Sequence, residues 1–443
     1  MSGLTDSLFS TPALAALFTD AALVARMAAF EAALAQAQAE AGVIPPTAAA
    51  AIGAGASAAF DVDALCGEAV RSGTLAVPFV QALTRIVQAR DPMAASFVHF
   101  GATSQDVLDT AFVLQAKAAL TLIEADLERA ITAAAGIARE HRGAIMLGRT
   151  LMQPATPITF GLKAAQWLAG LLDAGEALRF AAGRALKLQF GGAAGTLGAL
   201  GVHGPQVARR LALALDLPPG DLPWHARRGP LAELCAALAI LAGVCGKAAR
   251  DIALMAQAEV GEAFEGAEPG RGGSSAMPHK RNPVRAMQIL ANAARAPHLA
   301  ASIMAGLPQE HERALGGWQA EWAVAPELFK LAGGSAAQLA ALLATLDVRA
   351  DRMRANFDAL GGLPMTEAVA LMLAPKLGKL EAQAIVEMAA RATGPGLTLG
   401  EALRADPRVT EAASQADLSR ALDPDLALGC AQAFIDAALA RVR

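Results

Sequence analysis

The residues best suited to chemistry lie in one stretch, GRGGSSAMPHKRNP, at positions 270–283. Five of its first six residues are Gly or Ser, and three cationic or potentially cationic side chains follow the Met-Pro step. A glycine-rich segment can close over a substrate and exclude water. Ser274 and Ser275 would lie on that segment, Lys280 would supply fixed positive charge, and Asn282 would donate hydrogen bonds. A flexible linker is the alternative interpretation, but linkers rarely end in P-H-K-R-N-P.

A second polar cluster, HFGATSQD, occupies positions 99–106. His99 precedes a glycine, and Thr103 and Ser104 stand where a long helical pattern begins, with Asp106 in its first turn. Free amides at a helix N-terminus bind carboxylate or phosphate groups well. Taken alone, this cluster is explained better by ordinary helix capping.

Two further clusters flank the long helical patterns. In GRTLMQPATP, at 148–157, Arg149, Thr150 and Gln153 lie between a Gly turn and a Pro that suits a helix start. Arginine suits bidentate carboxylate binding, although an ordinary loop with one surface arginine is the better interpretation of this cluster alone. QFGGAAGTLGAL, at 189–200, has four glycines that allow close backbone approach, but it lacks the G-x-G-x-x-G pattern of a dinucleotide site.

Together the clusters predict a site for a small polyanion with a serine as candidate acid or base, and neither a metal nor a cofactor is expected. The formal net charge is −4, with charges of both signs scattered along the chain. Nucleic acid and membrane are therefore poor partners. The four cysteines are far apart and are expected to be buried free thiols.

The composition predicts an all-α protein, because Ala and Leu are abundant and β-branched residues are sparse. The N-terminus lacks the features of a secretory signal, and the most apolar stretch, 234–246, is too short to span a membrane, so a cytoplasmic location is expected. Helical periodicity predicts long helices over about 104–139, 156–186, 231–263, 284–304 and 319–346. Helices of this length must bury a stripe of apolar side chains against one another, which favours an elongated bundle. We expect three helical domains, at 1–105, 106–345 and 346–443.

The segment GSSAMPHKRNP, at 273–283, resembles the signature loop of the fumarase/aspartase superfamily, which includes the adenylosuccinate and argininosuccinate lyases. HFGATSQD and GRTLMQPATP are similar to the other two conserved regions of the superfamily, in the same order. The resemblance covers essentially the whole chain. It implies three helical domains with a central long-helix bundle, and a homotetramer whose twenty-helix core builds each active site from three subunits.

The resemblance also implies a type of chemistry, the reversible β-elimination that the superfamily catalyses. A base removes a proton from the carbon next to a carboxylate, and the site stabilises the dianion that forms. The residue that matches the base is Ser274, the matching lysine is Lys280, and the matching substrate-binding asparagine is Asn282. An unassisted serine is too weak a base, so it needs nearby positive charge and loop amides to lower its pKa.

Two departures from the superfamily pattern narrow the activity. Adenylosuccinate lyases have R-T-H in the second region, where the histidine is the general acid, and this chain has Leu151 at that position. Their histidine partners a glutamate, and the matching position here is Met287. Loss of both members of the pair suggests that the leaving group needing that acid is absent.

Several stretches resemble a lactone-forming branch of the superfamily, which closes 3-carboxy-cis,cis-muconate to 4-carboxymuconolactone in protocatechuate degradation. They are FSTPALAALFTD at 9–20, FGGAAGTLGALG at 190–201, LPWHARR at 222–228 and PQEHERALGGWQAEW at 308–322. In this reaction the substrate's own carboxylate adds to an alkene carbon, and a proton is added at the neighbouring carbon. Because the nucleophile is tethered, the enzyme mainly supplies orientation, charge relief and a proton.

The resemblance then implies which residues bind the small tricarboxylate substrate. Ser274 handles the proton at carbon, with Lys280 and His99 as further catalytic candidates. Arg228 matches a carboxylate contact, although the branch usually carries a second arginine where this chain has Pro230. The other candidate substrate-binding residues are Thr103, Ser104, Arg149, Thr150, Gln153, Ser275, Asn282 and Arg313.

Two alternatives stay open at this point. An adenylosuccinate-type C–N lyase is the first, and Leu151 and Met287 argue against it. A non-catalytic structural homologue is the second, and the intact GSSAMPHKRNP loop argues against it, because a scaffold gains nothing from a mobile serine beside a lysine.

Overall fold

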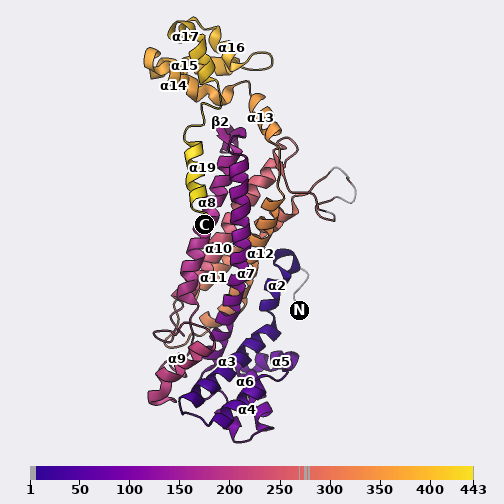
Figure 1. Ribbon diagram of the computed structural model, residues 1–443, viewed down its shortest axis with the longest axis vertical. Coiled ribbons are helices and arrows are strands. Elements are labelled where there is room, and N and C mark those ends of the chain that lie inside the picture. Colours follow the sequence, from indigo (N-terminus) through magenta and orange to yellow (C-terminus); the bar gives the residue numbers. More distant parts are fainter. Residues whose placement is uncertain (1–5, 269, 274–276, 278–279, 443) are drawn as a thin grey trace. The chain divides into compact units, whose positions relative to one another are not determined.

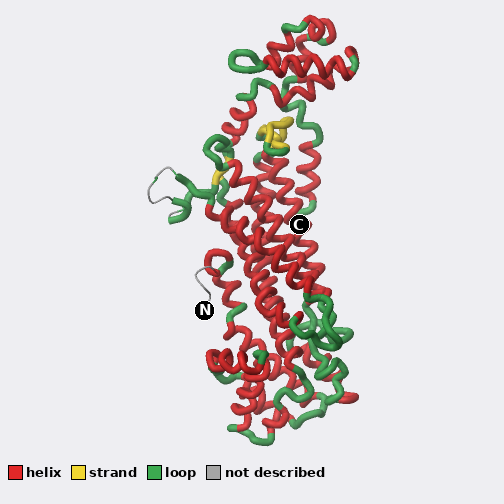
Figure 2. Tube along the Cα trace, turned by 180° about the vertical axis from the view of Figure 1, so that it is seen from behind, coloured by secondary structure: helices red, strands yellow, loops and turns green. Residues whose placement is uncertain are grey.

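The computed structural model describes residues 6–268, 270–273, 277 and 280–442. Helices dominate these residues (Figure 1), and the strands among them form two small two-stranded sheets, seen in yellow in Figure 2. The all-α prediction is therefore confirmed. The chain packs into two compact units, one of Met1–Leu127, Ala174–Gly246 and Gln288–Ala337, the other of Glu128–Asp173, Lys247–Met287 and Gln338–Arg443. The three-domain division stays a prediction.

Five long helices each contribute residues to both units. They are α7 (Ser104–Glu140), α8 (Phe160–Ala185), α10 (Gly229–Met255), α11 (Val284–Ala305) and α12 (Gly317–Ala344). Their bounds agree with the periodicity within a few residues at eight of the ten ends. Helix α8 begins later than expected because Gln153–Thr159 forms a strand. Helix α10 ends at Met255 because the chain turns there and then enters a short strand, β3 (Ala263–Phe264).

Each of the remaining elements falls into one unit. The first unit holds α1 (Asp6–Phe9), α2 (Pro12–Leu17), α3 (Asp20–Glu40), α4 (Pro46–Ala56), α5 (Val62–Ser72), α6 (Ala76–Gln88), α9 (Gly204–Ala214) and the 3₁₀ turns Ala94–Phe97 and Gly201–His203. The second unit holds β1 (Ile145–Thr150), β2 (Gln153–Thr159), β3 (Ala263–Phe264), β4 (Asp347–Val348), α13 (Ala350–Asp358), the 3₁₀ turn Leu363–Met365, α14 (Thr366–Leu377), α15 (Lys379–Ala392), α16 (Leu399–Arg404), α17 (Pro407–Ala412), α18 (Gln415–Ala421) and α19 (Ala431–Ala440).

The long helices contact one another through aromatic and charged side chains as well as through alanine. In the first unit, Phe112 on α7 packs edge-on against Phe329 on α12, with ring centroids 6.0 Å apart. In the second unit, the indole N–H of Trp167 on α8 donates to Asp251 on α10 over 2.8 Å. These contacts fix the rotation of each helix about its own axis. That rotation determines which polar side chains of the helix point toward the candidate active site described below.

Helix α10 is the one unbroken helix of the described chain that is long and apolar enough to cross a membrane. Of its most apolar window, 56% is buried inside the protein, and a core helix of a large bundle has the same character. Cys235 and Cys245 lie in this helix, and burial raises the pKa of each thiol to about 12. The expectation of buried thiols fails for Cys430, which is exposed directly before α19, and Cys66 is half-buried.

Helix α3 contributes apolar side chains to the core of the N-terminal region and also carries buried polar side chains. Thr19 caps its N-terminus by accepting a hydrogen bond from the N–H of Ala22. Phe30 and Leu34 are buried in a cluster with Phe79 of α6. Two polar side chains are buried on the same helix, Glu31 and Gln38, and both hydrogen-bond to the segment that precedes α7.

Two adjacent glycines of α12 let the N-terminal segment approach that helix closely. A β-carbon on Gly334 would lie 2.1 Å from the carbonyl oxygen of Phe9, and one on Gly333 would lie 2.4 Å from a methyl carbon of Leu14. Asn292 on α11 donates to the same Phe9 carbonyl over 2.9 Å. The segment before α3 is therefore held by backbone contacts that a side chain would displace.

We expect Gly334→Ala to lower the free energy of unfolding by about 1–3 kcal/mol, because the new methyl group overlaps backbone atoms of Phe9. Gly53→Ala is the matched control, since no atom lies within 4 Å of the added carbon inside α4. That change should be neutral or stabilising by up to about 1 kcal/mol. Urea unfolding of both variants measures the difference, and equal effects would show that the close approach does not constrain the fold.

Candidate active site

A buried carboxylate, that of Asp106 in the first turn of α7, organises the polar part of the first unit. It accepts hydrogen bonds from the backbone N–H groups of Gly191 at 3.0 Å, Gly192 at 2.8 Å and Thr103 at 3.1 Å. The Nε2 atom of His225 lies 2.7 Å from its Oδ1. The bond from Thr103 caps the helix start, as the sequence predicted, and the other three join that start to the glycine-rich loop and to the LPWH segment.

The glycine-rich loop comes close to α7 because it has no side chains at the contact. Gly192 has φ of +70°, and a β-carbon there would lie 2.9 Å from the carbonyl oxygen of Gly101. A β-carbon on Gly191 would lie 2.6 Å from Pro223. The two glycines therefore permit the backbone approach that the sequence suggested, and they present their N–H groups to a carboxylate of the protein.

His99 is held just ahead of α7 in an unusual backbone conformation, with φ of +57°. Its Nδ1 lies 2.5 Å from Oε1 of Glu31, whose side chain is 1% exposed. Burial by itself lowers the pKa of His99, but the charge and hydrogen bond of Glu31, together with the charge of Asp106, outweigh burial and raise the pKa above its usual value. Sequence reasoning missed Glu31, and its signal was a lone acid in the apolar run MAAFEAALA.

Arg313 is brought to the same place from the segment before α12. Its Nε donates to the Gln105 side chain over 3.2 Å, and its Nη2 donates to the carbonyl of Ala193 over 3.0 Å. Thr103 and Ser104 are half-buried at the start of α7. The first unit therefore gathers four of the predicted site residues, His99, Thr103, Ser104 and Arg313, around one helix N-terminus and one glycine-rich loop.

Arg228 lies in the same unit, but its donors are already occupied. The guanidinium is buried, donates to Asp109 over 2.7 and 3.1 Å, and also bonds to Glu321. Burial lowers the pKa of Arg228, yet Asp109 and Glu321 together hold it above its usual value. Trp318 also donates to Asp109, and Arg228 stacks over the ring of Trp224. The structure therefore pairs Arg228 with two carboxylates of the protein.

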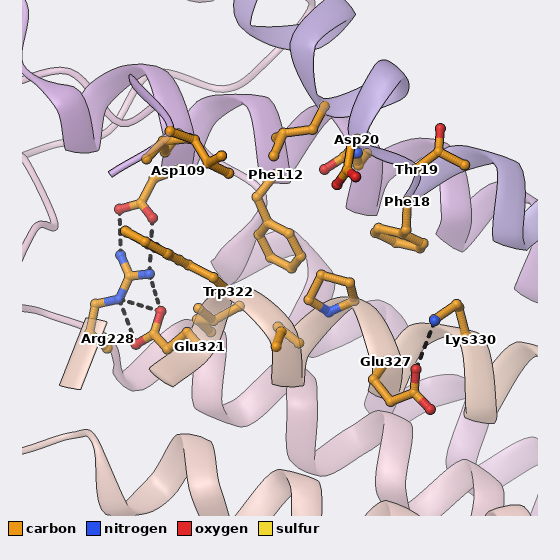
Figure 3. Close-up of a pocket in the computed structure, with 18 residues that line it drawn as sticks. Phe18, Thr19, Asp20, Asp109, Phe112, Arg228, Glu321, Trp322, Glu327 and Lys330 are labelled. Atoms are coloured by element: carbon orange, nitrogen blue, oxygen red, sulfur yellow. Dashed lines mark hydrogen bonds and ion pairs between the residues drawn. The ribbon is translucent and has the colours of Figure 1, made fainter. Parts of the chain in front are cut away.

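Beside this ion cluster is a cavity of about 280 Å³, shown in Figure 3. Three aromatic side chains, those of Phe18, Phe112 and Trp322, line it together with several leucines. Its charged lining residues are four acids and two bases, namely Asp20, Asp109, Glu321, Glu327, Arg228 and Lys330. An acidic cavity repels a small polyanion, so this cavity does not suit a tricarboxylate.

In the second unit, the predicted loop at 148–157 is a β-hairpin and not a helix start. Strands β1 and β2 are antiparallel, with Arg149 opposite Pro154 and Thr150 opposite Gln153. The turn is formed by Leu151 and Met152, which have φ of +49° and +66° and are both exposed. Prolines fit an edge strand as well as a helix start, which explains the incorrect assignment.

Arg149 projects from this hairpin and forms a bidentate ion pair with Glu262, at 2.7 and 2.8 Å. The Glu262 side chain is fully buried and also accepts from Asn356 over 2.9 Å. About a third of the arginine side chain stays exposed, at 29%. Thr150 and Gln153 are exposed beside the turn. Glu262 was the second functional partner that sequence reasoning missed.

The signature loop is also in the second unit. Ser274 and Ser275 lie outside the described residues. The described ends of the loop pair with each other, because the N–H of Asn282 donates to the carbonyl of Gly272 over 2.8 Å and Gly273 forms a bridge with Arg281. Lys280 and Asn282 line a surface hollow of about 190 Å³. Lys280 is exposed. Of the predicted site residues in this loop, the described ones are Lys280 and Asn282, and they lie together at this hollow.

The loop leads directly into α11 through a carboxylate cap. Glu265 accepts hydrogen bonds from the N–H groups of Arg285 at 3.1 Å and Ala286 at 2.7 Å, which are otherwise unpaired at the helix start. Arg281 donates to the carbonyl of Glu265 over 2.9 Å. The C-terminal end of the signature loop is thereby fixed to the start of α11.

Comparison with known proteins agrees with this architecture. A family model described as lyase matches residues 8–297, and one described as adenylosuccinate lyase C-terminus matches residues 362–438. The chain belongs to this lyase family, within the fumarase/aspartase superfamily, and is an enzyme.

Individual relatives within this family are similar to the chain over nearly its whole length. A 3-carboxy-cis,cis-muconate cycloisomerase from Bradyrhizobium diazoefficiens is 48% identical, over 98% of this chain and 97% of its own length. A nitrosuccinate lyase from Streptomyces davaonensis is 44% identical, over 99% of this chain and 94% of its own length. The crystal structure of a 3-carboxy-cis,cis-muconate lactonizing enzyme from Pseudomonas putida matches with a TM-score of 0.93 and 40% identity, over 100% of this chain and 99% of that one.

We expect Asp106→Asn to lower the free energy of unfolding by about 3 kcal/mol, because an amide group would face N–H donors that now meet a carboxylate. Asp63→Asn is the matched control, since Asp63 is an exposed acid in the first turn of α5. Its effect should be below about 1 kcal/mol. Chemical denaturation measures both, and a small effect at position 106 would contradict the central role of this carboxylate.

Proposed function

We propose that this protein is a cycloisomerase that closes 3-carboxy-cis,cis-muconate to 4-carboxymuconolactone, as a step of protocatechuate degradation. The observation that carries the proposal is the 48% identity, over nearly the whole of both chains, to a 3-carboxy-cis,cis-muconate cycloisomerase. The apolar residues Leu151 and Met287, which stand where adenylosuccinate lyases have an acid–base pair, are consistent with a reaction that releases no amine.

The reaction joins two parts of one molecule. A carboxylate oxygen of the substrate bonds to an alkene carbon, a proton adds to the neighbouring carbon, and the negative charge of the molecule falls by one. The carbanion-like intermediate lies next to a second carboxylate, so positive charge and hydrogen-bond donors lower the barrier. No group leaves, and no cofactor takes part.

Ser274 transfers the proton at carbon, and the ammonium group of Lys280 stabilises the negative charge that develops. The exposed position of Lys280 at the end of the signature loop supports this role, because its charge is free to meet a substrate. Asn282 and Ser275 bind the substrate beside them.

The three carboxylates of the substrate require several donors. His99, Thr103, Ser104 and Arg313, gathered at the start of α7, bind one carboxylate, and the helix N-terminus adds its own attraction for an anion. Arg149, with Thr150 and Gln153 on the hairpin, binds another through the exposed part of its side chain. Arg228 positions α7 and α12 through Asp109 and Glu321, because those carboxylates occupy its donors.

The protein works in the cytoplasm as a homotetramer in which three subunits contribute to each active site. Support comes from large apolar side chains exposed on the long helices, where a soluble monomer would normally carry polar residues. Phe180 on α8 is 64% exposed and Ile240 on α10 is 53% exposed. Light scattering coupled to size-exclusion chromatography tests the assembly, and a monomeric mass would contradict it.

A second candidate function is a lyase acting on nitrosuccinate, and the 44% identity to a nitrosuccinate lyase favours it. Elimination from a succinate derivative would use the same serine, lysine and loop amides. Like the cycloisomerase, this reaction releases no amine, so Leu151 and Met287 do not distinguish the two.

The substrate is decided by three parallel assays on the purified protein. With 3-carboxy-cis,cis-muconate we expect loss of the absorbance of the conjugated diene. Nitrosuccinate would show release of nitrite, and adenylosuccinate would show release of fumarate. Diene loss with a kcat/KM at least about a hundredfold above the other two confirms the cycloisomerase; faster turnover of either other substrate contradicts it.

We expect Ser274→Ala to lower kcat by about a hundredfold or more, because the proton transfer loses its side chain. The melting temperature should barely change, because the sequence places Ser274 in a glycine-rich segment and not on the apolar face of a helix. Ser302→Ala is the control, because this exposed serine on α11 bonds only to the carbonyl of His298 among the described residues. Steady-state kinetics and thermal melts test both variants, and retained turnover in the first would remove Ser274 from the mechanism.

A further inference from the structure

We propose that Glu31 on α3 is a positioning residue that holds His99 as an imidazolium and directs its Nε2 toward a substrate carboxylate. The proposal rests on the function proposed above, because it assigns His99 to an anionic substrate. Glu31 does not touch the substrate. It acts through the ring of His99, which it orients and keeps charged.

The first observation is the contact itself. Nδ1 of His99 lies 2.5 Å from Oε1 of Glu31, and Glu31 is almost completely buried, with 1% of its side chain exposed. The second oxygen of this carboxylate, Oε2, is buried and has no hydrogen-bond partner among the described residues. A buried carboxylate with so few partners is costly unless a cation lies beside it. The imidazolium of His99 is that cation.

Packing alone does not account for an acid at this position. Glu31 follows Phe30 and precedes Leu34 by less than one turn, and both apolar residues are buried in the N-terminal core. An apolar side chain would suit such surroundings better. The glutamate is therefore explained by its partner and not by the stability of the helix.

The second observation is that α3 fixes the backbone of the histidine segment as well as its ring. Gln38, seven residues after Glu31 and so on the same face of the helix, donates to the carbonyl of Phe100 over 2.6 Å. His99 has φ of +57°, in the left-handed region that residues other than glycine seldom adopt. Gly101, two residues further on, has φ of +73° and packs on Leu200. Contacts on both sides thus hold the segment in a strained conformation.

The third observation concerns the other edge of the ring. Of the His99 side chain, 16% is exposed, and Nε2 is not a buried atom left without a partner. No hydrogen bond joins Nε2 to the described residues. With Nδ1 bonded to Glu31, the imidazolium can donate from Nε2 to an incoming carboxylate at the start of α7.

Two acids on two helices act on the charge of His99, and the cation Arg313 lies at the same helix start, bonded to Gln105 and to the carbonyl of Ala193. Glu31 faces it from α3, and Asp106 faces it from α7 while bonded to Gly191, Gly192 and His225. Both are acids, so both favour the protonated ring. The charge on His99 is therefore present at low pH and is lost as the pH rises through the raised pKa of the ring. Without Glu31 this loss occurs at a lower pH.

The test compares the titration of His99 in the wild type and in Glu31→Gln, which keeps the shape but removes the charge. Histidine labelled with ¹³C at Cε1 reports each imidazole by NMR, and His99→Asn identifies the signal. We expect the midpoint of His99 to move to lower pH in Glu31→Gln. The basic limb of the pH profile of kcat/KM should move with it, with about a tenfold or greater loss above neutral pH and near-normal activity in acid.

Three further variants separate positioning from simple packing. Glu31→Asp retains the charge and should recover part of both effects; it also serves as the test if Glu31→Gln does not fold. Gln38→Ala loosens the same segment without changing charge, so it should lower activity equally at every pH and leave the midpoint in place. Glu40→Gln removes an exposed acid of α3 that pairs with Arg210, and it should change neither.

An unchanged midpoint for His99 in Glu31→Gln, or a loss of activity that is equal at every pH as in Gln38→Ala, would overturn the proposal. Failure of the proposed function has a different signature. In that case the wild type would not consume the muconate, while the NMR titration would still show whether Glu31 sets the charge of His99.

Discussion

The arrangement of the first unit depends on one buried carboxylate, that of Asp106. A carboxylate can accept several hydrogen bonds at once, and its charge makes each of them stronger than a bond between neutral groups. Asp106 uses this capacity to join the start of α7, the glycine-rich loop and His225. Apolar residues of the loop and of the helix start, among them Phe190, Leu200 and Val107, are buried in one cluster, and the carboxylate holds the backbone amides beside it. The residues that we assign to substrate binding in this unit lie on the segments that this carboxylate connects.

The other buried charges show how an alanine-rich bundle accommodates ionic groups. Arg228 has two carboxylates, Asp109 and Glu321, and the partner of Arg149 is Glu262. A buried charge without a partner costs several kcal/mol, so the buried Arg228 is neutralised by its two carboxylates, whereas Arg149 pairs with the buried Glu262 and keeps 29% of its side chain exposed. The cations that we assign to the tricarboxylate are therefore Arg313 and Lys280, which have neutral partners or open surroundings, and the partly exposed Arg149. Because His99 is paired but still has a second donor, it can serve both the fold and the substrate.

Sequence periodicity was reliable for the long helices and failed at the hairpin. Apolar spacing is a local property, and most ends of the five long helices fall within a few residues of the expected positions. Where β1 and β2 form a hairpin, the sequence predicts a loop and a helix start, because Pro154 and Pro157 fit a helix start as well as a strand. The turn of the hairpin contains Leu151 and Met152 at positive φ, where glycine or asparagine is the usual signal. Only pairing between the two strands makes that conformation stable.

The sequence by itself determined the helical class, the superfamily and the residue types of the site, because each of these is written in local spacing or in an uninterrupted motif. Tertiary structure alone decided the partners. Glu31 and His99 are 68 residues apart, Asp106 and His225 are 119 apart, and Gln105 and Arg313 are 208 apart. No local pattern selects one acid among the 41 in the chain. The choice is made when packing of the apolar helix faces brings particular side chains within hydrogen-bond distance, and electrostatics then decides which groups are charged.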